Sequence, residues 1–320
     1  MLVVSGVSIA YSVKWMKDHH FQENKIPLMG IVGAFVFAAQ MINFSIPGTG
    51  SSGHIVGSIL LAALLGPEAA FISLAGVLLV QALLFADGGL LAYGANLFNM
   101  GFWGCFFVYP FIFQPLYHEK EKLLPLACIV SSVITVLLGA FTVTLETLAS
   151  GITELPMKVF LGFMLSIHFF IGIGEGIATY CVLAFVKKNL LVAKQYVSSS
   201  TEKKSLKKLS VVLAVIALVL GGAFSLIASS SPDGLEWSVE KTAGTEEIDG
   251  VASSFHEFFA MLSQKFTIFP DYSFQNSDAW IGTTISGILG CIVSFLIIVG
   301  IIKLVHFFKR DKKNSFVNHA

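Results

Sequence analysis

The feature that most constrains this chain is a series of long apolar runs separated by short polar connections. The hydrocarbon core of a bilayer, about 30 Å thick, needs about 20 apolar residues of α-helix to cross it. Charged residues make up only 12% of the chain, and the mean hydropathy is +0.79. A soluble surface needs roughly a quarter of charged residues. We therefore predict an all-α polytopic membrane protein and exclude the folds of soluble enzymes.

The hydropathy pattern predicts nine membrane segments, of which the first is short. Proline favours the first turn of a helix, so the Gly66-Pro67 pair predicts a break between two helices rather than one long helix. The nine segments are residues 1–16, 26–46, 55–66, 68–86, 93–114, 123–149, 157–187, 208–229 and 281–308.

The distribution of lysine predicts the orientation, because cytoplasmic loops of membrane proteins are enriched in Lys and Arg. The 187–208 connection carries seven lysines and one glutamate, and the C-terminal tail is also basic. The 230–279 loop has the opposite character, with nine carboxylates and two lysines. We expect a plasma-membrane protein with its N-terminus outside and its C-terminus in the cytoplasm, and with the 47–54 loop and the Asp87 turn outside.

Composition also predicts the domain organisation. A compact seven-helix unit with a shortened first helix precedes a Ser-rich and then basic linker, and a two-helix hairpin with a long extracytoplasmic loop follows. No internal repeat is evident, which argues against a carrier built from inverted repeats. The predicted boundaries are 1–190, 191–207, 208–308 and a cytoplasmic tail at 309–320.

The densest cluster of polar and glycine residues ends at His54. Residues 48–53 formally match a dinucleotide-binding GxGxxG motif, but that motif needs a preceding strand and a βαβ unit, and here both flanks are membrane segments. The pattern instead predicts a tight loop whose glycines allow a close backbone approach. Histidine is a preferred ligand of nickel, cobalt, copper and zinc. His54 is therefore the best candidate metal ligand, the alternative being a helix cap or a headgroup contact.

Three amides lie inside apolar helices, where an amide needs a hydrogen-bonding partner. Gln81 lies within the 68–86 segment, whereas Asn96 and Asn99 are spaced i, i+3 and face the same side of the next helix. They fit hydrogen bonds between helices or, alternatively, the lining of a polar site. Asp87 with two following glycines is an ordinary turn signal.

The 157–187 segment contains two ionisable residues, His168 and Glu175, seven positions apart on one helical face. Ionisable residues within a membrane are functional or internally paired by default. Glu175 is predicted to be an interior polar contact, with metal ligation and proton coupling as alternatives. Gly172 and Gly176, spaced as GxxxG, predict close helix packing on the same helix.

Several other chemistries are excluded. The four cysteines lie singly in apolar runs, so neither a disulfide framework nor a zinc site is expected. His256-Glu257 lacks the second histidine of a metalloprotease, and no P-loop is present. A net charge of zero gives no footprint for nucleic acid. No enzymatic activity and no permanently bound cofactor are expected.

Several motifs resemble the substrate-binding (S) component of nickel/cobalt energy-coupling-factor transporters, the CbiM/NikM family. A later motif, Ser231-Pro-Asp-Gly-Leu-Glu236, resembles the PDGLE domain, which is related to the NikN-type accessory subunit. The motifs of the first resemblance are Ile46-Pro-Gly-Thr-Gly-Ser-Ser-Gly-His54, Leu65-Gly-Pro67, Gln81-Ala-Leu-Leu-Phe-Ala-Asp-Gly-Gly89, Gly94-Ala-Asn-Leu-Phe-Asn-Met100 and His168 with Ile171-Gly-Ile-Gly-Glu175.

The resemblance implies a transported substrate and partners. An S component captures Ni²⁺ or Co²⁺ at its outer face, and a transmembrane coupling subunit with two cytoplasmic ATPases drives release inward. Cobalt would serve cobalamin biosynthesis, while the PDGLE-like module favours nickel. Seven S-component helices and two accessory helices in the family equal the nine predicted segments.

The chain departs from the family pattern at its start. That pattern places metal ligands on an N-terminal Met-His and on the loop histidine that corresponds to His54, but this sequence begins Met1-Leu2. A start upstream of Met1 is one explanation, and a degenerate member with weakened binding is the other. His19 and His20 are expected on the inner side and cannot substitute. The alternative function is a membrane scaffold or accessory protein that transports no ion.

Overall fold

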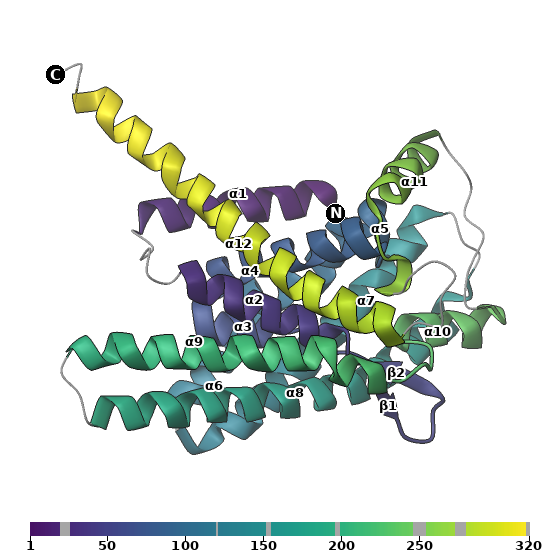
Figure 1. The fold of residues 1–320 in the computed structure, drawn as a ribbon. Coiled ribbons are helices and arrows are strands. Elements are labelled where there is room, and N and C mark those ends of the chain that lie inside the picture. The colour runs from purple at the N-terminus through teal and green to yellow at the C-terminus, as the bar shows by residue number, and fades with distance from the viewer. Residues whose placement is uncertain are drawn as a thin grey trace.

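The structure is a computed structural model, and it describes residues 1–19, 26–119, 121–151, 155–195, 199–245, 254–272 and 280–317. Helices make up nearly all of it (Figure 1). His20 lies outside the described residues. The predicted all-α membrane fold is confirmed, apart from one small hairpin.

Helical segments of the described chain follow the nine predicted apolar segments in order. The predicted break is confirmed, because Gly66 has a φ of 89° and Pro67 opens the next helix. The segments are α1 (Leu2–Asp18), α2 (Ile26–Gln40), α3 (Ser58–Leu65), α4 and η2 (Pro67–Val80 and Gln81–Phe85), α5 and η3 (Gly89–Leu97 and Phe98–Phe113), α7 (Leu124–Ser150), α8 (Met157–Gln195), α9 (Ser199–Gly222) and α12 (Trp280–Val317).

Not every segment is a full membrane crossing. Among the described residues, five helices are long and apolar enough to span a bilayer, while α2 and the 208–222 part of α9 are shorter apolar helices. With eight residues, α3 is about 12 Å long at 1.5 Å per residue. The predicted 26–46 segment is also too long, because α2 ends at Gln40.

Two short strands replace the end of that predicted segment. Strands β1 (Phe44–Ile46) and β2 (Ser51–Gly53) pair antiparallel, with Phe44 opposite Gly53 and Ile46 opposite Ser51. Three-residue strands carry no alternating pattern long enough to detect by period. We refer to residues 44–53 as the glycine-rich hairpin.

The acidic 230–279 segment contains more helix than its polarity predicts. Hydropathy detects membrane spans and misses short amphipathic helices. In the described part of 223–272 the structure has η5 (Phe224–Ile227), α10 (Gly234–Ala243), α11 (Ser254–Phe266) and η6 (Pro270–Tyr272). A separate connection, between η3 and α7, contains α6 (Gln114–Glu119) and η4 (Glu121–Leu123).

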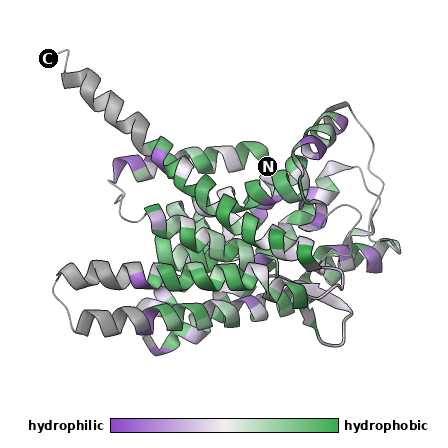
Figure 2. Cartoon of the chain, in the orientation of Figure 1, coloured by the Kyte–Doolittle hydropathy of each residue, from purple (hydrophilic) through white to green (hydrophobic). Residues whose placement is uncertain are grey.

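The connections divide between two opposite ends of the bundle (Figure 1). The glycine-rich hairpin, α10, α11 and the N-terminus lie at one end, whereas the C-terminal end of α12, the end of α8 and the start of α9 lie at the other. Apolar residues dominate between these ends (Figure 2). Which end faces the cytoplasm stays a prediction from the lysine distribution. We call the first end the hairpin end.

Close packing between α7 and α8 follows from the predicted glycine pair. A Cβ added at Gly172 would lie 2.7 Å from the Cα atom of Val133, and one at Gly176 would contact the Cα atom of Ile129. Small residues let two membrane helices approach at the backbone. This packing sets the height at which His168 and Glu175 lie within the bundle.

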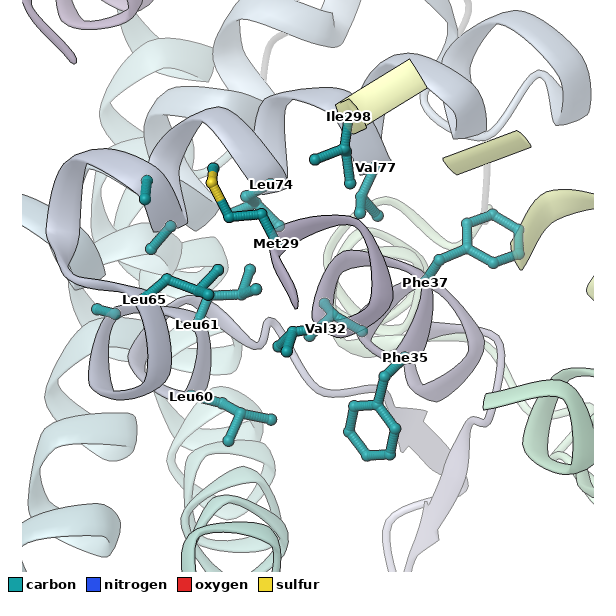
Figure 3. Packing of buried hydrophobic residues seen from close by; sticks show 14 of the residues in the cluster. Met29, Val32, Phe35, Phe37, Leu60, Leu61, Leu65, Leu74, Val77 and Ile298 are labelled. Atoms are coloured by element: carbon teal, nitrogen blue, oxygen red, sulfur yellow. The ribbon is translucent and has the colours of Figure 1, made fainter. Parts of the chain in front are cut away.

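The hydrophobic core continues across the predicted domain boundary. One cluster of buried residues includes Met29, Val77 and Phe37 of the first unit together with Leu213 and Ile298 from the last two long helices. Figure 3 shows Ile298 of α12 beside Val77 and above the α2 side chains. The two helices of the second unit are therefore packed into the first rather than tethered beside it.

Candidate functional site

Turn geometry explains the glycine-rich hairpin. Gly48 and Gly50 have φ values of 79° and 76°, a left-handed region in which side chains are strained. The Thr49 hydroxyl donates to Ile46 O at 2.8 Å and accepts from Ser51 N–H at 3.1 Å, which closes the turn. Gly53 meets the predicted need for close approach, since a Cβ there would lie 2.8 Å from Ile171 Cδ1 of α8.

The second unit docks on this hairpin through its Ser-Pro-Asp-Gly-Leu-Glu motif. Ser52 N–H donates to Pro232 O at 2.8 Å, and the Ser52 hydroxyl donates to Ser231 O at 2.7 Å. The Trp237 indole N–H donates to Thr49 O at 3.0 Å. Residues from the two predicted domains thus build one surface, which we call the outer seam and define as residues 229–237 against 43–53.

Asp233 and Glu236 form a capping box that begins α10 directly on the hairpin. Asp233 Oδ1 accepts from the N–H groups of Leu235 and Glu236 at 2.8 Å each, and Glu236 Oε2 accepts from Asp233 N–H at 3.0 Å. Such a box satisfies backbone donors that a helix start leaves unpaired. The motif is thereby a structural start signal as well as a docking element.

A cavity of about 380 Å³ lies behind the outer seam. Its apolar lining includes Val136, Met164 and Ile171 from α7 and α8. Its polar lining comes from both units and consists of Gln40, His54, Gln81, Asp87, Asn96, Asn99 and His168 from the first and Asp233 and Glu236 from the second. A cavity with a few converging polar groups is typical of a small-ligand site.

Both histidines of the cavity have one ring nitrogen fixed by a backbone carbonyl. His54 Nδ1 lies 3.1 Å from Ile55 O, and His168 Nδ1 lies 2.7 Å from Met164 O. A carbonyl oxygen only accepts, so each Nδ1 must donate, and in the neutral form of each ring the lone pair is on Nε2. A second hydrogen bond of this kind is how a metal-binding histidine has its tautomer and orientation set.

Gly234 lies against the second of these rings. A Cβ at Gly234 would lie 3.0 Å from His168 Cε1 and 2.7 Å from Ile171 Cδ1. Only a glycine therefore lets the start of α10 approach α8 this closely. The second unit forms part of the wall beside His168.

Glu175 lies outside the cavity lining, although it is fully buried. Its two oxygen atoms accept backbone N–H groups, Oε2 from Val56 at 3.1 Å and Oε1 from Gly57 at 2.9 Å. Both of these residues follow His54 closely in the chain. In this structure Glu175 makes an interior polar contact next to the His54 segment.

The three predicted amides all line the cavity. Gln81 Nε2 donates to Gln40 Oε1 at 3.1 Å. Asn99 Nδ2 donates to Glu146 Oε2 at 3.0 Å, and its Oδ1 accepts from the Thr142 hydroxyl. Asn99 thus bonds helix to helix and also borders the cavity, so the two alternatives are compatible.

The N-terminal end of α1 lies close to this polar border. The Ser5 hydroxyl donates to Gly94 O at 2.7 Å, and the terminal amine acts electrostatically on Glu146, the partner of Asn99. His19 is at the opposite end of α1. Among the described residues, no three His, Cys, Asp or Glu side chains are arranged to hold a metal ion together.

Four residues in or beside the site were not among the predicted site residues. Gln40 ends an apolar run and carries the same signal as Gln81. Asp233 and Glu236 match the D-x-x-E pattern of a capping box, which marks a helix start. Tyr272, whose hydroxyl donates to Asp87 Oδ2 at 2.6 Å, has no comparable local signal because the two residues are far apart in the chain.

Comparison with family models divides the chain into two matches. The model described as "Cobalt uptake substrate-specific transmembrane region" (CbiM) matches residues 1–193. The PDGLE domain model matches residues 207–307. The outer seam therefore joins residues of two recognised families.

Individual relatives carry the same pair of units. A protein of Archaeoglobus fulgidus named "Putative fused nickel transport protein NikMN" is 32% identical over 293 residues, covering 91% of this chain and 89% of that one. A "Probable fused nickel transport protein LarMN" of Lactiplantibacillus plantarum is 30% identical over 315 residues, covering 89% and 87%.

A solved structure supports the assignment at the level of the fold. A crystal structure of a transition metal transporter is 32% identical, has a TM-score of 0.50, and covers 64% of this chain and 93% of that one. Together with the family matches, these relatives show that the chain belongs to the CbiM family of cobalt uptake substrate-specific transmembrane proteins and carries a PDGLE domain.

Proposed function

We propose that this protein captures divalent nickel or cobalt at its outer face for import across the plasma membrane. The observation that carries the proposal is the cavity at the hairpin end, in which His54 and His168 each have Nδ1 bonded to a backbone carbonyl, so that Nε2 is the nitrogen left for a metal. Neutral imidazole nitrogen suits both ions. His54 is the primary ligand, whereas His168 is a secondary candidate and Glu175 a supporting residue.

The relatives favour nickel as the substrate. The two fused relatives are named as nickel transport proteins, while the description of the CbiM family names cobalt. The fusion with a PDGLE domain is the feature that this chain shares with the nickel proteins. Cobalt, delivered for cobalamin biosynthesis, is the second candidate.

The energy source is a separate module. The sequence has no P-loop, so in this proposal two cytoplasmic ATPases and a transmembrane coupling subunit drive release of the ion, as in energy-coupling-factor importers. The basic end of the bundle, where α8 and α9 meet, faces the cytoplasm. The hairpin end and the N-terminus face outward.

The test is a nickel titration of the purified protein in two forms, one that begins at Met1 and one with an N-terminal extension that begins Met-His. The extension supplies the second half of the family's ligand pattern, and α1 begins near the cavity border. We expect the extended form to bind more tightly, since one imidazole alone makes a weak site.

The direct ligand test is His54→Ala in the extended form. We expect a loss of affinity of about 100-fold or more, because even an outer-shell partner is worth about 10–100-fold. His19→Ala removes an imidazole from the opposite end of α1 and is the matched control. Unchanged affinity of His54→Ala would place the site elsewhere, and no nickel or cobalt binding by either form would favour a scaffold.

A further inference from the structure

Two peptide groups between β2 and α3 carry the segment that follows His54. They are the Ile55–Val56 and Val56–Gly57 peptides. Gly57 has a φ of 80° and precedes the first residue of α3. The segment belongs to neither the strand nor the helix, so side chains from other elements must hold it.

The first peptide links His54 to Glu175. Its oxygen, Ile55 O, accepts the His54 Nδ1–H at 3.1 Å, and its N–H, on Val56, donates to Glu175 Oε2 at 3.1 Å. The imidazole and the carboxylate are thus bonded to opposite ends of one planar group. Rotation of that plane would turn the His54 ring.

The second peptide is held in the same way. Its N–H, on Gly57, donates to Glu175 Oε1 at 2.9 Å, and its oxygen, Val56 O, accepts from Gln40 Nε2 at 2.9 Å. Gln40 is oriented in turn by Gln81, whose Nε2 donates to Gln40 Oε1 at 3.1 Å. Glu175, on α8, is therefore hydrogen-bonded to both peptides, and Gln40, on α2, is hydrogen-bonded to the second.

Both oxygens of Glu175 accept hydrogen bonds from adjacent N–H groups. The amide of glutamine cannot reproduce this pairing, because its nitrogen only donates. A peptide whose N–H donates a hydrogen bond has a more polarised carbonyl. That carbonyl is the one that accepts the His54 Nδ1–H.

We propose that Glu175 and Gln40 are positioning residues that hold His54 in its metal-binding orientation through their hydrogen bonds to the two peptides beside it. Neither residue needs to contact the ion. This inference rests on the proposed function, because it assigns a role toward the ligand His54.

The first test is Glu175→Gln in the full-length chain. Glutamine keeps the shape but directs an NH₂ group at one of the two N–H donors. We expect nickel affinity to fall by about 10–100-fold, with a changed d–d absorption spectrum of the bound nickel and faster hydrogen exchange at the Val56 and Gly57 amides. A lower folded fraction alone would reduce the number of sites without changing the spectrum.

Thr179→Val is the matched control. Thr179 lies one turn further along α8, is 1% exposed, and its hydroxyl has no hydrogen-bond partner among the described residues. Valine has the same shape, so affinity and spectrum should stay at the parental values. A loss as large as that of Glu175→Gln would show a general effect on α8 and overturn the proposal.

Gln40→Leu is an independent test of the same proposal, because Gln40 lies on α2 and Glu175 on α8. Because both residues hold the same segment, the fold-losses of Gln40→Leu and Glu175→Gln should be non-additive in the double variant. If His54→Ala loses binding while Glu175→Gln keeps parental affinity and spectrum, this inference fails and the proposed function stands. If nickel binds but its affinity is insensitive to His54→Ala, the site lies elsewhere and this inference fails, whereas the proposed function itself fails only if neither nickel nor cobalt binds.

Discussion

Two of the contacts between the PDGLE domain and the CbiM domain differ in chemistry. In the membrane, α12 packs on α2 and α4 through apolar atoms, and glycines allow the contact. A Cβ at Gly30 would lie 2.7 Å from Phe295 Cδ2, and one at Gly76 would lie 2.7 Å from Ile298 Cγ1. We call this contact the membrane seam. At the outer seam the contact consists largely of hydrogen bonds, such as Ser52 N–H to Pro232 O at 2.8 Å.

The difference follows from the two solvents. Within lipid, apolar burial gives no advantage over contact with acyl chains, so helices associate by close packing of small residues. Outside the membrane, polar groups that leave water need partners. The membrane seam should therefore govern whether the two domains stay together, and the outer seam should govern the shape of the cavity.

The largest effect is expected from Gly33→Leu in the membrane seam. A Cβ at Gly33 would overlap Ile298 Cδ1, so the larger side chain must push α12 away. Overpacking of this kind costs about 1–3 kcal/mol, and we expect a value near the upper end in thermal unfolding of the detergent-solubilised protein. Nickel affinity of the folded fraction should change little.

Two further variants sharpen this prediction. Ile298→Ala in the Gly33→Leu background should restore part of the stability by making room for leucine. Gly300→Leu is the matched control, since no atom lies within 4 Å of a Cβ built there. Equal destabilisation by Gly300→Leu would mean that added bulk on these helices, rather than the seam, sets the stability.

A smaller effect, of the opposite kind, is expected from Gly234→Leu in the outer seam. The new side chain would collide with Ile171 and the His168 ring and lift the start of α10 away from the cavity. We expect nickel affinity to fall about tenfold, equivalent to about 1.4 kcal/mol, while thermal stability changes by less. Calorimetric titration and thermal unfolding of the same sample separate the two quantities.

Gly162→Leu, on the same helix as His168, has open space around it and is the control for Gly234→Leu. The comparison between seams would break down if Gly234→Leu lowered stability as much as Gly33→Leu while nickel affinity stayed at the parental value. The outer seam would then be a second structural contact.

The sequence predicted the membrane seam's helices far better than the outer seam. Apolar runs and the Gly66-Pro67 pair located the nine helical segments, because lipid imposes a length and a composition on each span. A close helix contact on α8 was also predictable from Gly172 and Gly176, although its partner, α7, was not. Each of these signals is local in the chain.

The site was predictable only as a set of residue types. His54, His168 and Gln81 were recognisable as polar groups in apolar surroundings, and the structure brings them to one cavity. The docking of Pro232 on Ser52 joins residues 180 positions apart. No local sequence rule predicts such a pairing, and none predicts the hydrogen bond between Glu175 and the Gly57 amide.

The smallest effect is expected from Tyr272→Phe, at the far edge of the outer contact between the domains. The Tyr272 ring stacks on Phe85 with centroids 4.6 Å apart, and its hydroxyl donates to Asp87 Oδ2 at 2.6 Å. Burial, and then the negative charge of Asp87, raise the pKa of Tyr272 well above its usual value. The hydroxyl therefore stays protonated, and the hydrogen bond would be lost only as the pH rises through that raised pKa.

Phenylalanine keeps the stacking and removes the hydroxyl, together with its hydrogen bond to Asp87 and its polar contact with Gln81. The loss of the bond to Asp87 should cost about 1 kcal/mol. The Ile268 and Phe269 amides donate to Leu84 O at 3.0 Å each, and they report on this segment. We expect their hydrogen exchange to become about fivefold faster, equally at mildly acidic and mildly alkaline pH. Tyr11→Phe, on the exposed face of α1, is the control. Unchanged exchange in Tyr272→Phe would show that ring stacking alone holds the segment, and polar contacts would then matter only where the PDGLE motif meets the glycine-rich hairpin.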